Sequence, residues 1–352
     1  MKSRIAVISL RFNPAFVQHA VAFAKLAREA MHEPAFILDN KYESFPELKA
    51  VAPIFGVESA RTLDSLTHAI FLNASPENQK LAVELKARNV KLYYILHEPW
   101  QISWNFITSE GLQQSIKTLL AHYLTTPVLR LSENVLLASH FGLEAYQKHD
   151  VKYNQHYAYF PLIYDDKPIK DVQAVVAKKQ YFGFLGSLCR AHGFDHYVSF
   201  MRYAFEQGLD VRFLIASRYP LSESIRKQPI IARNLNRIEI RCGRALSNEE
   251  MDQCYAESIS IWMLYRRCTQ SGVLPKAMMH GAPVIAAPIG AIPEQITEGV
   301  NGRFSRALDH ARTWDAFRDI STAREVYFEN CRQTFLTQFY YRSMLPLFEK
   351  LL

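Results

Sequence analysis

The sequence predicts an α/β protein built from two successive doubly wound domains, and three observations carry this prediction. Short apolar segments of strand length alternate with amphipathic segments of helix length along most of the chain. The alternation is interrupted once, by the charged, proline-containing stretch 165–170, and then starts again. The length of 352 residues exceeds what one ordinary hydrophobic core supports and suits two domains of typical size.

The N-terminal half reads as a series of βαβ units. Residues 5–10 form the first expected strand, and residues 14–30 the first expected helix, with Val17, Val21 and Ala24 spaced near a period of 3.6. Further strands are expected at 35–38, 69–72, 92–96 and 135–138, and helices at 77–88 and 109–123. Strands separated by helices indicate a parallel sheet that is covered on both faces.

A second series of the same kind follows the interruption. Strands are expected at 181–185, 211–216, 238–240, 259–264 and 284–286, and helices at 194–207, 248–257 and 275–280. Ser247 and Glu250 have the spacing of a capping box at the start of the helix 248–257. Because ligands bind beyond the carboxyl ends of the strands in such sheets, we expect two Rossmann-like domains that face each other across a cleft.

The domain boundaries follow from the interruption. We expect an N-terminal domain over residues 1–164, a linker over 165–180, a C-terminal domain over 181–330 and a helical tail over 331–352. The tail is rich in aromatic and aliphatic side chains that must be buried, and the N-terminal domain is the candidate surface for it to return to.

Composition excludes several classes of protein. Hydrophobic residues make up 49% and charged residues 21%, as in a folded globular protein, and no apolar run approaches the ~20 residues of a membrane span. The five cysteines lack metal-site spacing, no Asp-x-Asp pair or His/carboxylate cluster is present, and the first residues read as a buried strand rather than a signal peptide. We therefore expect a cytoplasmic protein with reduced thiols and no metal.

Charge narrows the possible partners. The net charge is +7, but no dense block of Lys and Arg marks a nucleic-acid surface, so no nucleic-acid partner is expected. A mildly basic chain with many aromatic residues is compatible with peripheral contact with the inner membrane.

The most informative stretch covers residues 270–302. It combines a loop at Ser271 and Gly272, a short helix that begins at Val273, a buried strand and a further turn at Glu294. Backbone N–H groups at the start of a helix favour an anion such as a diphosphate, and a glycine keeps side-chain atoms away from it. This loop is therefore a candidate anion-binding site.

Three segments resemble the C-terminal half of the family 4 (group 1) nucleotide-sugar glycosyltransferases. Residues 270–302 are similar to the family's G-x-P-x-x-E-A-M-x-x-G-x-P-V-I run and its G-I-P-E…G-x-N-G sequel. Residues 184–193 are similar to its strand followed by G-R-L-x-x-x-K-G, and residues 243–250 to its segment beside the nucleobase. The resemblance is close over 181–304 and holds in outline for the N-terminal half.

The resemblance implies a GT-B fold, with a nucleotide sugar held by the C-terminal domain and an acceptor by the N-terminal domain. It implies a hexosyltransferase of polysaccharide biosynthesis that moves a sugar from a nucleoside diphosphate to a hydroxyl of a glycan or of a lipid-linked or protein-linked saccharide. The reaction would be retaining, with no metal and no cofactor other than the sugar nucleotide. The implied donor-binding residues are Gly186, Ser187, Arg190, His192, Gly243, Ser271, Gly272, Val273, Lys276 and Glu294.

The sequence departs from the family where charge is expected. The family's two glutamates fall on Cys268 and Lys276, and the Arg and Lys of its phosphate clamp fall on Ser187 and His192. Arg190 is the candidate for the missing cation, with Lys276 as a second, because the leaving diphosphate gains negative charge in the transition state.

In the N-terminal half, His97 and Glu98 directly follow the expected strand 92–96. His97 is similar to the family's strand-end histidine, which faces the transferred sugar. Glu98 is a candidate general base for an inverting reaction instead. Arg11 and Asn13 lie in the first strand-to-helix loop and are the acceptor-side candidates, although the family's glycine pair is absent there.

Two other interpretations stay open on the sequence. One is a GT-B sugar-nucleotide epimerase or phosphorylase, and the other is a degenerate GT-B protein that binds without catalysis, which the missing carboxylates allow. A dinucleotide-dependent dehydrogenase is disfavoured, because no G-x-G-x-x-G follows an expected strand.

Overall fold

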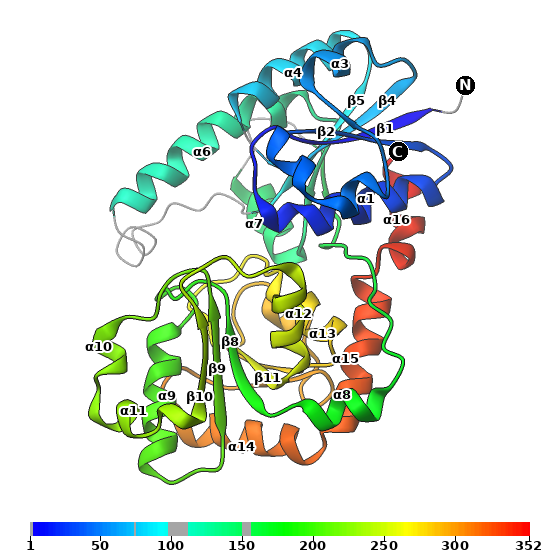
Figure 1. Cartoon of the computed structure of the whole chain (residues 1–352). Coiled ribbons are helices and arrows are strands. Elements are labelled where there is room, and N and C mark those ends of the chain that lie inside the picture. Colours follow the sequence, from blue (N-terminus) through cyan, green and yellow to red (C-terminus); the bar gives the residue numbers. More distant parts are fainter. Residues whose placement is uncertain (1–2, 74, 98–111, 150–155) are drawn as a thin grey trace. The chain divides into compact units, whose positions relative to one another are not determined.

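The chain folds into two compact units, each built on its own parallel sheet (Figure 1). The computed structural model describes residues 3–73, 75–97, 112–149 and 156–352. The first unit comprises Met1–Asp166 and Thr337–Leu352, and the second comprises Lys167–Leu336.

The first unit has a seven-stranded sheet in the order β3-β2-β1-β4-β5-β6-β7. All of its strand pairs are parallel, and the order reverses at the first strand, as in a Rossmann sheet. The strands are β1 (Arg4–Ser9), β2 (Glu33–Leu38), β3 (Ile54–Phe55), β4 (Leu66–Phe71), β5 (Lys91–Leu96), β6 (Asn134–Leu137) and β7 (Tyr157–Tyr159). The helices are η1 (Pro14–Phe16), α1 (Val17–Glu29), η2 (Asn40–Ser44), α2 (Pro46–Lys49), α3 (Val57–Thr62), α4 (Pro76–Ala87), α6 (Leu112–Leu131), α7 (His140–His149), η5 (Tyr341–Met344) and α16 (Leu345–Leu351).

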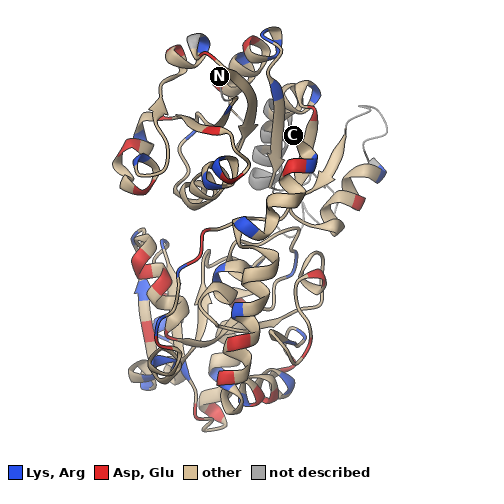
Figure 2. Ribbon diagram, turned by 90° about the vertical axis from the view of Figure 1, so that its right-hand side faces the viewer, with Lys and Arg blue, Asp and Glu red and all other residues tan. Residues whose placement is uncertain are grey.

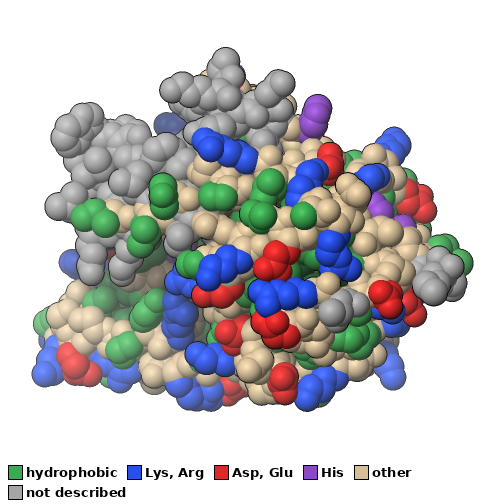
Figure 3. Space-filling model, turned by 90° about the horizontal axis from the view of Figure 1, so that it is seen from above, with side chains coloured by type: hydrophobic (Ala, Val, Ile, Leu, Met, Phe, Trp, Pro, Cys, Tyr) green, Lys and Arg blue, Asp and Glu red, His purple; other side chains and the backbone are tan. Residues whose placement is uncertain are grey.

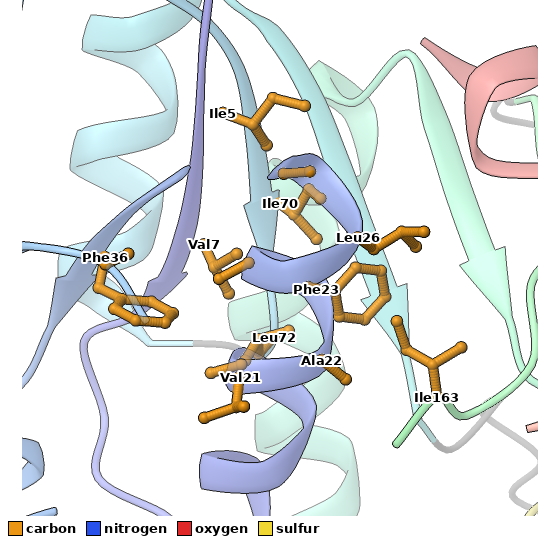
Figure 4. Packing of buried hydrophobic residues seen from close by; sticks show 14 of the residues in the cluster. Ile5, Val7, Val21, Ala22, Phe23, Leu26, Phe36, Ile70, Leu72 and Ile163 are labelled. Atoms are coloured by element: carbon orange, nitrogen blue, oxygen red, sulfur yellow. The ribbon is translucent and has the colours of Figure 1, made fainter. Parts of the chain in front are cut away.

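Successive side chains along a strand point to opposite faces of the sheet, so the core of this unit has two layers, one on each face. Ile5 and Val7 of β1 are buried with the apolar face of α1, whereas Ala6 and Ile8 are buried with α4 and α6 on the other face of the sheet. Figure 4 shows Val21, Phe23 and Leu26 of α1 among the other residues of this cluster, which include Ile5, Val7 and Ile70 of the strands. Full burial of each large apolar side chain stabilises the fold by ~1.5–3 kcal/mol, so both faces hold the strand register.

The end of the chain completes the first layer. Phe348 of α16 lies 6.5 Å from Phe23 and 6.1 Å from Phe160, measured between ring centroids. The Tyr93 hydroxyl donates to the Leu351 carbonyl at 2.9 Å, and the Arg342 guanidinium pairs with Glu29 at 2.9 Å. The last sixteen residues therefore belong to the first unit, and Phe339, Tyr341 and Phe348 are buried in it.

The second unit has a six-stranded parallel sheet in the order β10-β9-β8-β11-β12-β13, which again reverses at its first strand. The strands are β8 (Tyr181–Leu185), β9 (Arg212–Ser217), β10 (Ile238–Cys242), β11 (Ser258–Met263), β12 (Val284–Ala286) and β13 (Gly302–Phe304). The helices are α8 (Val172–Lys178), α9 (Phe194–Glu206), α10 (Glu223–Arg226), α11 (Pro229–Arg233), η3 (Leu235–Arg237), α12 (Asn248–Ala256), α13 (Val273–Met279), η4 (Ile292–Glu294), α14 (His310–Thr322) and α15 (Arg324–Gln338).

The two parallel-sheet Rossmann-like domains expected from the sequence are thus confirmed, with differences in detail. The capping box at α12 is present, because the Ser247 and Glu250 side chains each accept a backbone N–H of the other. The short strands β3, β7 and β13 were not predicted, since segments of two or three residues carry no readable alternation. The segment 165–180 contains helix α8, which begins at the cap residue Asp171.

Ion pairs fix the chain on each side of the boundary between the units. Lys25 of α1 pairs with Asp165 in the first unit, and Lys167 pairs with Asp252 of α12 in the second. Elsewhere charges are mixed in sign: Figure 2 shows Lys and Arg interspersed with Asp and Glu, and so does the face in Figure 3. Among the described residues, no helix combines the length and apolar character that crossing a membrane requires.

Lys179 is a buried cation in the core of the second unit. Its ammonium group donates to the carbonyls of Ser258 at 3.0 Å and His280 at 3.1 Å and lies 5.6 Å from the centroid of the Phe328 ring. Burial lowers its pKa from the usual 10.5 to about 7. Lys179 therefore joins α8, β11 and the end of α13 at the cost of desolvating its charge.

This burial predicts a specific pH dependence of stability. Above pH 7 the folded chain releases the Lys179 proton, whereas the unfolded chain keeps it up to about pH 10.5. The free energy of unfolding should therefore rise with pH, by ~1 kcal/mol between pH 7 and pH 8. Urea denaturation at both pH values should show this rise for the wild type and lose it in Lys179→Met. An equal rise in both proteins would mean that Lys179 does not titrate in the fold.

Candidate functional site

In the second unit, the candidate site lies where the strand order reverses, between β8 and β11. Loops that follow these two strands leave the sheet at its carboxyl edge, which is where ligands bind in doubly wound sheets. The loop after β8 begins at Gly186, whose φ of +123° favours glycine and whose N–H donates to the Ala216 carbonyl at 2.9 Å. Ser187, Arg190 and His192 follow in the same loop.

An aromatic stack joins the two loops. The His192 imidazole lies on the ring of Tyr265, which follows β11, with 4.7 Å between the ring centroids and 21° between the planes. The Tyr265 hydroxyl shares a hydrogen bond with Ser271, and burial raises the pKa of Tyr265. His192 and Ser187 also both hydrogen-bond with the thiol of Cys189. The structure thus brings Ser187, His192 and Ser271, three of the expected donor-site residues, into one neighbourhood.

Two glycines set the spacing of these loops. Gly193 has a φ of +67°, and a Cβ atom there would stand 2.2 Å from the carbonyl oxygen of Leu264. Gly290 has a φ of +54°, and its Cβ would stand 1.9 Å from the carbonyl oxygen of Cys268. Any side chain at either position would force the loop after β11 away from its neighbour.

Arg266 connects the two loops by ionic contacts. Its guanidinium donates to both carboxylate oxygens of Asp195 at 2.7 Å and also to the Arg190 carbonyl. The hydrogen bonds from Arg266 lower the pKa of Asp195 below its usual value. Tyr265 and Arg266 were not predicted from the sequence. Their position directly after a buried strand was the only available signal.

Arg190 itself is exposed, and its guanidinium takes part in no ion pair among the residues that the structure describes. Its backbone carbonyl is held by Arg266 and by the N–H of Gly193, at 2.9 Å. The loop is therefore fixed at Arg190 while the charged end of the side chain is available to an anion.

The start of α13 differs in part from the expectation. Gly272 is the N-cap with φ −70° and ψ −14°, so its backbone conformation does not by itself require glycine. The Val273 N–H donates to the Ser271 hydroxyl at 3.3 Å, which satisfies one of the donors at this helix end. The case for glycine at Gly272 thus depends on the space that a bound group would need.

Lys276 interacts with the charges of a different part of the unit. It is half-buried on α13, and burial lowers its pKa, while Asp252 raises it and Lys167 lowers it. Asp252 in turn contacts the His280 imidazole at 3.1 Å and pairs with Lys167. The charges that act on Lys276 therefore come from this polar cluster rather than from the loop after β8.

The remaining donor candidates lie on loops after other strands. Gly243 follows β10 with a φ of +96°, is exposed, and donates its N–H to the Ser217 carbonyl at 3.2 Å. Glu294 ends η4, between β12 and β13, and is also exposed. Both positions follow carboxyl ends of strands, where the sequence placed them.

In the first unit, a pocket of about 630 Å³ lies where the strand order reverses between β1 and β4. It is lined by Leu10, Arg11, Phe12, Asp39, Lys41, Ser75, Pro76 and Glu77. Polar side chains hold its first loop: Asn73 donates to the Arg11 carbonyl at 2.6 Å, and the Tyr42 hydroxyl donates to the Asn13 carbonyl at 3.1 Å. Arg11 is therefore an exposed cation on a fixed loop.

The other candidates of this unit have different surroundings. The Asn13 side chain accepts the Ala15 N–H at 3.1 Å and caps η1, which gives it a structural role. His97 directly follows β5, is half-buried, and stacks on Phe16 of η1 with 4.7 Å between ring centroids. Glu98 lies outside the described residues. Within the described ranges, no three His, Cys, Asp or Glu side chains are grouped as metal ligands.

Known protein families and solved structures match this chain in sequence and in fold. Residues 179–321 match the family model described as glycosyl transferases group 1, which confirms the resemblance over most of the second unit. No curated protein matches the sequence.

Solved structures match over the whole chain at low identity. HepE from Anabaena, in complex with UDP, is 15% identical, with 99% of both chains covered and a TM-score of 0.67. A TarM mutant from S. aureus, in complex with fondaparinux, α-GlcNAc-glycerol and UDP, is 9% identical, with 99% of both chains covered and a TM-score of 0.71. Sucrose-phosphate synthase from Thermosynechococcus elongatus is 14% identical, covering 99% of this chain and 98% of its own, with a TM-score of 0.67. At these identities the likeness establishes the fold, which is GT-B.

The Arg266 contacts predict a local effect on the loop after β8. In Arg266→Ala, hydrogen exchange of the Gly193 and Phe194 amides should accelerate. The Gly193 amide loses the guanidinium that holds its acceptor, the Arg190 carbonyl, and the Phe194 amide donates to the carbonyl of the preceding residue, Cys189. Overall stability should fall by no more than ~1 kcal/mol, since the Asp195 pair is partly exposed. Arg318→Ala, which removes the exposed Arg318–Asp315 pair on α14, is the matched control. Unchanged exchange in Arg266→Ala would show that the loop is held by other contacts.

Proposed function

We propose that this protein is a glycosyltransferase that moves a sugar from a nucleoside-diphosphate sugar to an acceptor hydroxyl. The observation that carries the proposal is the stack of His192 on Tyr265, which joins the loops after β8 and β11 inside the segment that matches the family model. UDP is the first candidate nucleotide, because HepE and TarM were both solved with it.

The diphosphate is proposed to bind between the loop Gly186–Arg190 and the loop Ser271–Val273. Gly186 and Gly272 offer backbone without side chains, and the Ser187, Ser271 and His192 side chains offer hydrogen-bond donors. The exposed guanidinium of Arg190 would then stabilise the negative charge that develops on the leaving diphosphate. Gly243 and Glu294 are proposed to contact the nucleoside and the sugar, as the resemblance implies.

Lys276 is kept in this proposal with a changed role. Because Asp252 and Lys167 are the charges that act on it, we propose that it influences the site electrostatically rather than as a direct phosphate ligand. The proposed reaction needs no metal, since a cation and backbone donors can stabilise the leaving group.

The first unit is proposed to supply the acceptor pocket. Arg11 and Phe12 line it, and a guanidinium next to an aromatic ring suits a saccharide with polar or anionic groups. The proposed acceptor is a glycan or a lipid-linked or protein-linked saccharide, and peripheral membrane contact would accompany a lipid-linked one. His97, fixed by its stack on Phe16, is proposed to act on the transferred sugar with retention of configuration, and a general base at Glu98 is the inverting alternative.

Loss of the Arg190 cation should weaken donor binding. Arg190→Ala is expected to lower UDP affinity ~10- to 100-fold in calorimetric titration, as one charge-assisted contact to phosphate is worth ~1.5–3 kcal/mol. Arg202→Ala removes an equally exposed cation from α9 and should leave the affinity unchanged. Absence of UDP binding by the wild type would contradict UDP as the donor nucleotide, and unchanged affinity in Arg190→Ala would contradict the assigned cation.

His97 should matter for transfer and not for nucleotide binding. In His97→Ala we expect UDP affinity within a few fold of the wild type and a rate of sugar transfer that is ~100-fold lower, as for the loss of one aimed polar contact. Initial rates with the UDP-sugar, paired with calorimetry on UDP, separate the two effects. Equal losses in both would make His97 a structural residue, and an unchanged rate would remove it from the mechanism.

A further inference from the structure

One aromatic side chain at the carboxyl edge of the second sheet is exposed and has no role in the site described so far. Tyr219 lies two residues beyond the end of β9 and is 44% exposed. Its loop is nevertheless fixed at both ends. Ser217 is buried, and its hydroxyl accepts the Tyr219 N–H at 3.2 Å, while Leu221 is buried in the core of the unit. A short, anchored loop therefore holds the Tyr219 ring outside the core.

Arg218 holds this ring in one orientation. Its guanidinium carbon lies 4.8 Å from the centroid of the Tyr219 ring, and the guanidinium also donates to the Tyr219 hydroxyl at 2.7 Å. Both contacts use one face of the ring and its hydroxyl end. Among the residues that the structure describes, no second cation and no other aromatic ring lies against Tyr219. One face of a fixed aromatic ring is thus available to a flat partner.

Two glycines leave the backbone on either side of the Tyr219 loop open. At Gly186, after β8, and at Gly243, after β10, a Cβ atom would meet no heavy atom within 4 Å outside the adjacent residues. Their N–H groups donate to the carbonyls of Ala216 at 2.9 Å and Ser217 at 3.2 Å, so the three loops stay side by side beyond the end of the sheet. Because neighbouring strands are ~4.8 Å apart, this open backbone extends over ~10 Å from β8 to β10.

The edge of the sheet is closed in the other direction. Gly290, after β12, packs so tightly that a Cβ atom would stand 1.9 Å from the carbonyl oxygen of Cys268, which follows β11. A nucleotide whose diphosphate lies between the loops after β8 and β11 therefore has room for its nucleoside over β9 and β10. Tyr219 is the exposed aromatic side chain on that side.

We propose, on the basis of the donor site proposed above, that the nucleobase of the sugar nucleotide stacks on the ring of Tyr219, which Arg218 holds in place. A nucleobase has flat faces of low polarity, and a fixed aromatic ring stacks on such a face with little loss of conformational freedom. Every base has a face of this kind. Tyr219 therefore adds affinity for a nucleotide over a bare diphosphate and does not select one base over another.

Calorimetry on the full chain separates the base from the diphosphate, with UDP and inorganic pyrophosphate as the two probes. Tyr219→Ala should lower UDP affinity ~5- to 100-fold, as expected for the loss of one stacked ring, and leave pyrophosphate affinity within about threefold of the wild type. Tyr219→Phe keeps the ring and should bind UDP within about threefold of the wild type. Leu235→Ala is the matched control, because Leu235 is 42% exposed and lies just before β10, at the amino edge of the sheet. It should bind both probes as the wild type does.

Failure of the stacking contact is distinguishable from failure of the donor site. If the wild type binds pyrophosphate at least as tightly as UDP, or if Tyr219→Ala keeps its UDP affinity, the diphosphate site stands and the stacking contact is overturned. Equal losses of UDP affinity in Tyr219→Phe and Tyr219→Ala would assign the contact to the hydroxyl and overturn stacking. Equal losses for UDP and pyrophosphate in Tyr219→Ala would overturn it too, because the side chain would then act on the diphosphate. A wild type that binds neither probe contradicts the donor site, and the stacking contact with it.

Discussion

Reversal of strand order in a parallel sheet is the constraint from which the rest of this structure follows. In both units the chain builds strands to one side of the first strand and then crosses to the other side, so the loops after β1 and β4, and after β8 and β11, leave neighbouring strands in opposite directions. Polar backbone groups line such a crevice at the edge of an apolar core. In the first unit it is the pocket beside Arg11, and in the second it holds the stack of His192 on Tyr265.

Close contacts that leave no room for an added side chain hold the shape of the crevice in the second unit. Gly193 and Gly290 let backbone approach backbone at distances that exclude a Cβ atom. Arg266 then connects the same loops through Asp195 and the Arg190 carbonyl. At the opposite, amino edge of the same sheet, Lys179 donates to two carbonyls, which costs desolvation of its charge but joins segments that are distant in sequence. The site is thus preorganised by the fold, whereas Arg190 keeps its charged end available.

The sequence predicted what depends on local pattern and missed what depends on tertiary contact. Apolar runs located the longer strands, and the Ser247–Glu250 capping box was predicted from spacing alone. The strands β3, β7 and β13 are too short to show a period. No spacing rule could bring Tyr265 onto His192, or expose Lys276 to the charges of Asp252 and Lys167, because these neighbours lie on different elements. Asn13 was expected on the acceptor side, and only the structure shows that it caps η1.

The central claim is that the loops after β8 and β11 form one nucleotide-diphosphate site, and hydrogen exchange with and without UDP tests it most directly. Ligand binding slows exchange where amides are ordered or bonded by the ligand. We expect saturating UDP to protect both segments, residues 186–193 and residues 265–273, in the same titration and at the same UDP concentration. Protection confined to one of these loops, or located only in other segments of the chain, would contradict it.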